Sequence, residues 1–96
     1  MTIVEFLRAR LDTFQAECER MEDIGEQGYW EFLLADIKAK RRIVDLHEGS
    51  HECTGYDHNG EIDNYKFALD SEDCSTLCLL ALPHADHPDY DPAWRP

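Results

Sequence analysis

The chain has 96 residues, 43% of them hydrophobic and 31% charged, a balance that fits one soluble globular domain rather than a disordered chain. Its 21 acidic and 9 basic side chains give a net charge of −12, which disfavours binding to nucleic-acid phosphates. No apolar run approaches the roughly 20 residues of a membrane helix, and the amino terminus lacks a signal-peptide pattern. We therefore expect a cytoplasmic protein whose four cysteines are free thiols or metal ligands.

The segment from about residue 3 to about residue 22 is predicted to form an amphipathic helix. Thr2 and Glu5 match the capping box S/T-x-x-E, which marks a helix start. Apolar residues then recur at steps of four and three along one face, at Ile3, Leu7, Leu11, Phe14, Cys18 and Met21. Cys18 on this stripe is therefore interpreted as a core residue.

A second helix is predicted over about residues 29–46, after a break marked by Gly25 and Gly28. Its apolar residues recur at helical spacing and are Trp30, Leu33, Leu34, Ile37, Ile43, Val44 and Leu46.

The basic run KAKRR lies in the middle of this second helix. Long basic side chains can cover apolar surface with their methylene groups while their charges reach water. Asp36 stands four residues before Lys40, the favourable order for a helical ion pair. The simplest interpretation is a solvated helix face. The alternative is a patch that binds a partner protein, with Lys38, Arg41 and Arg42 as its contacts.

Residues 49–73 are polar and irregular, and they contain Asn59-Gly60, a strong signal for a β-hairpin. The flanking residues alternate only weakly between polar and apolar. A short hairpin and a loop therefore both stay open as interpretations of this segment.

A short third helix is predicted over about residues 75–82, with Asp73 or Ser75 as its N-cap. Pro83 lacks an amide donor and crowds the preceding turn, so the helix should end near Leu82. The fold class is therefore mainly α: one domain, residues 1–96, with three helices and a polar loop or short hairpin between the second and the third.

The remaining tail, residues 83–96, is rich in proline and carries Tyr90 and Trp94. Disordered tails are usually poor in aromatic residues, so this tail should dock on a surface. Our first interpretation is that it packs back on the helices of its own domain. The second is that Tyr90 and Trp94 contact a partner.

Cysteines and histidines concentrate in the second half of the chain and could together hold one metal ion. Zn²⁺ prefers thiolate sulfur and imidazole nitrogen, usually four ligands in a tetrahedron. A hairpin would bring Cys53 back toward Cys74, and His47 lies at the root of the same segment. These three residues form the best geometric set. The candidates for a fourth ligand are His51, His58 and Cys78.

The letters H-E-G-S-H, from His47 to His51, fit the zinc-protease spacing H-E-x-x-H. That motif needs a continuous helix to place both histidines on one face, and Gly49 and Ser50 interrupt a helix here. The chain also lacks a Gly-rich phosphate loop and the G-x-S-x-G motif. We therefore expect no catalytic site.

Three stretches resemble a family of small proteins of unknown function from actinobacteria and their phages: TIVEFLRARLD, AKRRIVDLH and CSTLCLLALPHADHPDYDPAWRP. The last is the most specific, with its ALPxADHPDY core and a following tryptophan. The resemblance implies a small zinc site at positions that match His47, Cys53 and Cys74. Tyr56 stands where a second cysteine would follow Cys53. The resemblance implies no catalytic residues.

Three functions follow from these observations. The first is a non-enzymatic acidic protein, encoded by a phage or its host, that binds a protein partner and neither nucleic acid nor membrane. The second is a small zinc-stabilised binding domain. The third, and least favoured, is an enzyme that uses Cys53, Cys74 or the histidines.

Overall fold

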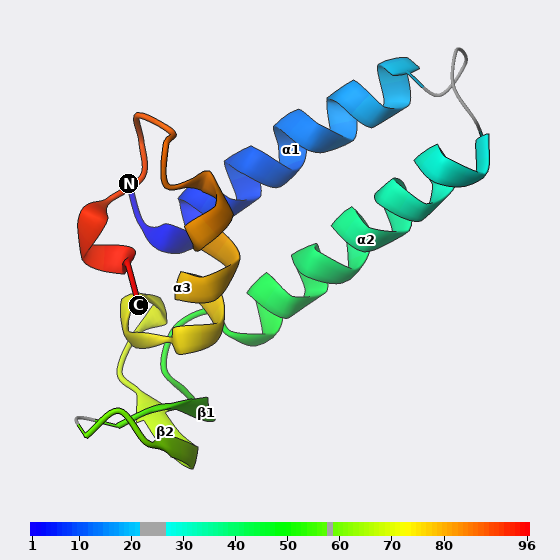
Figure 1. Ribbon diagram of the computed structural model, residues 1–96. Helices are drawn as coiled ribbons and strands as arrows, with labels where there is room; N and C mark the ends of the chain where they lie inside the picture. Colours follow the sequence, from blue (N-terminus) through cyan, green and yellow to red (C-terminus); the bar gives the residue numbers. More distant parts are fainter. Residues whose placement is uncertain (22–26, 58) are drawn as a thin grey trace.

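The computed structural model describes residues 1–21, 27–57 and 59–96. Two long helices, α1 (Ile3–Met21) and α2 (Gln27–Leu46), extend side by side from a compact base (Figure 1). The base contains strands β1 (His51–Tyr56) and β2 (Ile62–Ala68) and the helix α3 (Ser75–Ala81). Short 3-10 turns at Ser71–Asp73, Leu82–His84 and Pro92–Trp94 complete the chain.

The bounds of the long helices agree with the sequence patterns except at the start of α2, but Phe14 and Leu46 of the predicted apolar faces are 43% and 75% exposed. Helix α2 begins at Gln27, so Gly28 lies in its first turn and does not mark a break, contrary to our expectation. Glycine is tolerated there because the first amides of a helix have no partner within it. The predicted end of α1 at Glu22 and the predicted break at Gly25 lie outside the described residues.

The start of α1 forms the capping box that the sequence predicts. The Thr2 amide donates to the Glu5 carboxylate over 2.9 Å, and the Glu5 amide donates to the Thr2 hydroxyl over 3.1 Å. The capped end carries the most buried part of the apolar stripe. Cys18, further along, is 6% exposed and lies in the core as expected.

Charged side chains join α1 to α2. Arg8 contacts Asp45, in the last turn of α2, and Glu48, just beyond it, at 2.9 Å each. Arg41 contacts Asp12 at 2.7 Å. These pairs cross between the helices and fix which faces meet.

Strands β1 and β2 pair as an antiparallel hairpin, so the loop alternative is wrong. Cys53 pairs with Lys66, and the register shifts between Cys53 and Gly55. Gly60 has a φ of +80°, a conformation that glycine adopts without steric cost. The Asp57 carboxylate accepts from the amide of Glu61 over 3.0 Å and helps to close the turn.

The N-cap of α3 is Cys74, and neither Asp73 nor Ser75 takes that position. The reason lies in the preceding 3-10 turn, which Asp70 caps by accepting from the amides of Glu72 and Asp73. Asp73 is thereby held inside that turn. Cys74 follows in an extended conformation, and its side chain makes no capping bond. Helix α3 ends at Ala81 beside Pro83, as predicted.

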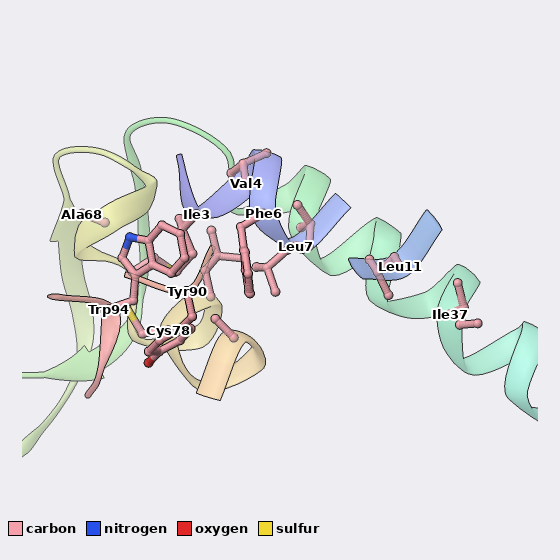
Figure 2. Packing of buried hydrophobic residues seen from close by; sticks show 14 of the residues in the cluster. Ile3, Val4, Phe6, Leu7, Leu11, Ile37, Ala68, Cys78, Tyr90 and Trp94 are labelled. Carbon is pink, nitrogen blue, oxygen red and sulfur yellow. The ribbon is translucent and has the colours of Figure 1, made fainter. Parts of the chain in front are cut away.

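The tail packs on the start of α1, in agreement with our first interpretation. Trp94 is 3% exposed, and its ring centroid lies 5.1 Å from that of Phe6, which is fully buried. Tyr90 contacts the same phenylalanine ring at 6.0 Å (Figure 2). The Glu72 carboxylate accepts from the Trp94 indole and, over 2.8 Å, from the Ile3 amide. The fold is therefore mainly α, with a two-stranded sheet between α2 and α3.

Candidate metal centre

His47 follows the last residue of α2 and points one ring nitrogen at the helix. Its Nδ1 lies 2.7 Å from the carbonyl oxygen of Ile43, one of the carbonyls that a helix end leaves without an internal partner. A carbonyl can only accept, so Nδ1 carries the proton. The Nε2 atom is then a lone-pair donor that can bind a metal.

His51 opens β1 and has the same arrangement. Its Nδ1 lies 2.8 Å from the Gly49 carbonyl oxygen, which again assigns the proton to Nδ1. Its Nε2 is buried and has no hydrogen-bond partner among the described residues. A buried polar atom without a partner is costly, and a metal ion bound to this nitrogen would remove that cost. The two imidazole rings lie 5.1 Å apart at 84°.

Cys74, the N-cap residue of α3, brings a thiol close to these histidines. Its side chain is fully buried, and its Sγ and one ring nitrogen from each of His47 and His51 all lie within 4.8 Å of one another. The Cys53 Sγ lies 4.0 Å from the Cys74 Sγ. Cys53 stands two residues after His51 on β1, so both side chains leave the strand on the same face.

The separation of the two sulfurs is close to that in a tetrahedral zinc site. Zn–S bonds near 2.3 Å place two coordinated sulfurs about 3.8 Å apart, and Zn–N bonds near 2.0 Å place nitrogen and sulfur somewhat closer. The sulfurs of Cys53 and Cys74 differ from that by a few tenths of an ångström. The ligand atoms of His47, His51 and Cys74, which lie within 4.8 Å of one another, would have to move closer together to reach bonding distance.

The surroundings of Cys53 favour its protonated form when no cation is bound. Burial raises the pKa of Cys53 above the ordinary value, and the neighbouring Cys74 thiol raises it further. A divalent cation between the two sulfurs would reverse this effect, because a coordinated thiol loses its proton.

The three alternatives for the fourth ligand have different outcomes. His51 joins the group, whereas His58 lies outside the described residues. Cys78 faces elsewhere, and its thiol donates to the Glu72 carbonyl oxygen over 3.7 Å. Tyr56, at the position where the resemblance expects a cysteine, is 49% exposed on the hairpin.

Two residues outside the predicted set of ligands help to position the site. Gly49 has a φ of +74°, which turns the chain from α2 into β1 and so brings His51 back toward His47. The Ser71 hydroxyl accepts from the Gly49 amide over 2.8 Å. The position of Gly49 directly after a helix was a sequence signal for this turn, whereas nothing in the sequence indicated the role of Ser71.

The residues that we assigned to a partner surface lie in different environments. Tyr90 and Trp94 are buried in the core, 8% and 3% exposed, and offer little surface to a partner in this fold. Arg41 is engaged with Asp12 and Gln15 of α1. Lys38 and Arg42 are exposed. The expected pair between Lys40 and Asp36 is present at 2.8 Å.

A separate apolar groove of about 480 Å³ lies where α1, α2 and α3 meet. Most of its lining is aliphatic or aromatic, with Asp36, Lys40 and His84 as the ionisable members. Burial lowers the pKa of His84, and the nearby charges of Arg10 and Lys40 lower it further. Phe14 and Leu79 also line the groove and are 43% and 49% exposed.

These observations define the protein as a small, mainly helical domain with a two-stranded hairpin, in which His47, His51 and Cys74 lie together and Cys53 lies beside Cys74. The chain belongs to the family of unknown function DUF6221, whose profile matches residues 1–96. Comparison with curated proteins and with solved structures found no match. Within the described residues, no helix has both the length and the apolar character that crossing a bilayer requires.

Proposed function

We propose that this protein is a zinc-stabilised domain in which His47, His51, Cys53 and Cys74 bind one Zn²⁺. The observation that carries the proposal is the buried Nε2 of His51, which lacks a partner among the described residues, in a side chain that lies in one group with His47 and Cys74. Two nitrogen and two sulfur ligands favour zinc over magnesium or calcium, which prefer oxygen.

The role of such an ion would be structural. Catalytic zinc keeps one coordination position open for water or substrate, whereas four protein ligands close the tetrahedron. The backbone carbonyls of Ile43 and Gly49 would orient the two histidines by holding Nδ1. The literal H-E-x-x-H spacing does not argue for a protease, because α2 ends at Leu46 and the two histidines come from different elements.

The metal would stabilise the part of the fold that is weakest without it. A two-stranded hairpin is only marginally stable in water, and strands β1 and β2 bury few side chains. One ion would tie β1 to the end of α2 through His47 and to the start of α3 through Cys74. Zinc binding contributes about 10 to 16 kcal/mol in zinc-finger peptides, enough to decide whether such a segment is ordered.

Metal analysis of protein purified without added zinc tests the proposal. We expect about one equivalent of zinc, and Co²⁺ in its place should give the intense visible absorption of a tetrahedral sulfur-ligated site. Less than a tenth of an equivalent, together with no binding of added Zn²⁺, would rule the site out.

Two serine variants make a matched pair for this test. Cys74→Ser removes a proposed ligand, whereas Cys78→Ser removes a buried thiol one helical turn away that bonds to a carbonyl. The first should abolish stoichiometric zinc and the second should retain it. Equal zinc content in the two variants would contradict the assignment of ligands.

Protein binding is a second candidate function, and the apolar groove favours it. An exposed apolar patch next to charged residues is a usual feature of an interaction surface. We propose as its occupant an amphipathic helix with a basic outer face, because the net charge of −12 would attract such a partner.

A panel of amphipathic helical peptides, basic and acidic, tests this second candidate by calorimetry. We expect only basic peptides to bind, and Phe14→Glu in the groove to weaken binding at least tenfold. Phe32→Glu is the control, because Phe32 is 67% exposed and does not line the groove. Absence of binding, or an equal effect of the two variants, would count against this role.

A further inference from the structure

Two of the four cysteines stand apart from the others because their sulfur atoms face each other. The Sγ atoms of Cys53 and Cys74 lie 4.0 Å apart, although 21 residues separate them in the chain. A disulfide has its sulfurs about 2.05 Å apart, so the pair needs an approach of about 2 Å. The same two thiols are the ones proposed to bind zinc.

The segments that carry these two cysteines can make that approach. Cys53 lies in a two-stranded sheet, next to the point where the strand register shifts. Cys74 has an extended backbone and lies between the 3-10 turn Ser71–Asp73 and α3. Neither residue is held in the interior of a long helix, so no helical hydrogen-bond ladder opposes this approach.

The remaining cysteines are differently placed. Cys18 is 6% exposed and lines the apolar groove on α1. Cys78 is 8% exposed, and its thiol is engaged with the Glu72 carbonyl. Cys53 is the only one of the four that is not buried. An oxidant in solution therefore reaches Cys53 first.

We propose that Cys53 and Cys74 form a peroxide-sensitive modification site, in which oxidation to a disulfide expels the metal. The part that concerns the metal rests on the function proposed above. The formation of the disulfide rests only on the distance between the sulfurs and on the exposure of Cys53.

The chemistry takes two steps with hydrogen peroxide as the oxidant. The Cys53 thiolate, which is the form of a zinc-bound thiol and the minor form of a free one, attacks one peroxide oxygen: an S–O bond forms, the O–O bond breaks, and hydroxide leaves, which gives a sulfenic acid. The Cys74 thiolate then attacks the Cys53 sulfur: the S–S bond forms, the S–O bond breaks, and a second hydroxide leaves. The two sulfurs lose two electrons, which the peroxide gains, and protons from solvent convert both hydroxides to water.

The metal would lose two of its four ligands in this reaction. His47 and His51 would remain, and two imidazoles alone bind Zn²⁺ far more weakly than the complete set. The hairpin would stay attached to α3 through the new covalent bond, while its connection to the end of α2 would be lost. Reduction and added zinc would restore the original state.

Treatment of the zinc-loaded protein with hydrogen peroxide tests the proposal by mass spectrometry, thiol titration and a zinc-sensitive dye. We expect an intramolecular disulfide that peptide mapping assigns to Cys53 and Cys74, a loss of two of the four titratable thiols, and release of one equivalent of zinc. Dithiothreitol with added Zn²⁺ should reverse all three changes.

Variants separate this pair from the other thiols. Cys53→Ser and Cys74→Ser should each abolish the intramolecular disulfide, whereas Cys18→Ser and Cys78→Ser should leave its formation unchanged. A disulfide that includes Cys78, a disulfide between two chains, or oxidation of Cys53 to sulfinic acid with no disulfide would overturn the proposal.

The same treatment of chelator-treated protein distinguishes the two proposals. If the protein binds no zinc but peroxide still joins Cys53 to Cys74, the zinc function fails and the modification site stands without its metal. If zinc binds with one equivalent and survives oxidation, or if no disulfide forms, the modification site fails alone.

Discussion

At the scale of single residues, the backbone sets the chemistry of the two site histidines. In each ring, Nδ1 donates to a backbone carbonyl oxygen. His47 donates to Ile43 over 2.7 Å, and His51 donates to Gly49 over 2.8 Å. Nε2 is therefore the available nitrogen in both rings. Because the Nε2 of His51 is buried without a partner among the described residues, this side chain should cost stability unless something binds it.

Replacing His51 by phenylalanine should therefore separate two effects. His51→Phe removes a ligand, so added zinc should no longer raise the free energy of unfolding. In metal-free protein the same change removes an unsatisfied buried nitrogen, and its cost should stay within about 1 kcal/mol. Urea unfolding with and without zinc measures both quantities. A variant that zinc still stabilises as much as the original protein would contradict the ligand role.

His84 gives the fold a separate dependence on pH. Burial, and then the charges of Arg10 and Lys40, lower its pKa in the folded protein. The unfolded chain therefore binds a proton more readily than the folded protein does. Above the pKa of an ordinary histidine, about 6.5, His84 is neutral in both states and does not reduce the free energy of unfolding. As pH falls below that value, the unfolded chain takes up the proton first, so the free energy of unfolding decreases.

Removing this titratable group should flatten the acid side of the stability profile. In chelator-treated protein, we expect His84→Phe to lose less unfolding free energy between pH 7 and pH 5 than the original protein does. The phenyl ring fits this environment, since His84 already lies 5.5 Å from the ring of Phe14. Parallel urea unfolding curves at the two pH values test this, and equal losses in both proteins would refute it.

At the scale of elements, the turn at Gly49 connects a helix end to a strand and so determines the position of the site. Its φ of +74° is unfavourable for residues with a Cβ, by about 1 to 2 kcal/mol. A Cβ added at Gly49 would meet nothing within 4 Å, so steric contact adds no further cost. The penalty of substitution is therefore purely conformational.

Gly49→Ala should lower the free energy of unfolding by about 1 to 2 kcal/mol and should weaken zinc binding. Gly28→Ala is the matched control, because its Cβ would also meet nothing within 4 Å but the residue is helical. This control should be neutral or stabilising by up to about 1 kcal/mol. Thermal unfolding and zinc titration of both variants would decide, and similar effects at the two positions would contradict the argument.

The sequence predicted the elements whose signals are local. Thr2 and Glu5 indicated the start of α1, and Asn59-Gly60 indicated the hairpin, because capping boxes and turns depend on a few neighbouring residues. The N-cap of α3 was missed because the 3-10 turn that Asp70 caps shifts the helix start to Cys74. That shift depends on the 3-10 turn before α3, which no local sequence pattern predicts.

The candidate site was predicted in part for the same reason. His47, Cys53 and Cys74 followed from the expectation that a hairpin returns the chain to its root. The choice of His51 over Cys78 depends on side-chain direction, which the turn at Gly49 and the packing of α3 determine. No sequence pattern indicated the role of Glu72, because the sequence around an acidic residue does not reveal which distant groups it binds.

At the scale of the whole molecule, Glu72 connects both ends of the described fold. Its carboxylate accepts from the Ile3 amide over 2.8 Å and from the Trp94 indole. These two donors belong to the first turn of α1 and to the last 3-10 turn. One carboxylate of an exposed residue thus links three distant parts of the chain.

Glu72→Gln should destabilise the protein by about 1 to 3 kcal/mol, because the neutral amide has only one oxygen to serve two donors. Asp73→Asn is the control: Asp73 is an exposed neighbour in the same 3-10 turn, and no side-chain bond from it is present among the described residues. Chemical unfolding followed by tryptophan fluorescence would measure the difference. Equal stability of the two variants would show that the carboxylate is dispensable.

The connection through Glu72 also has a consequence for the order in which the protein can fold during synthesis. The start of α1 leaves the ribosome early, yet Phe6 acquires its aromatic neighbours only after Tyr90 and Trp94 have been added. Until then Phe6 lacks the cover that these two rings provide. Nascent chains of this protein should therefore expose an apolar helix surface that a holding chaperone would recognise.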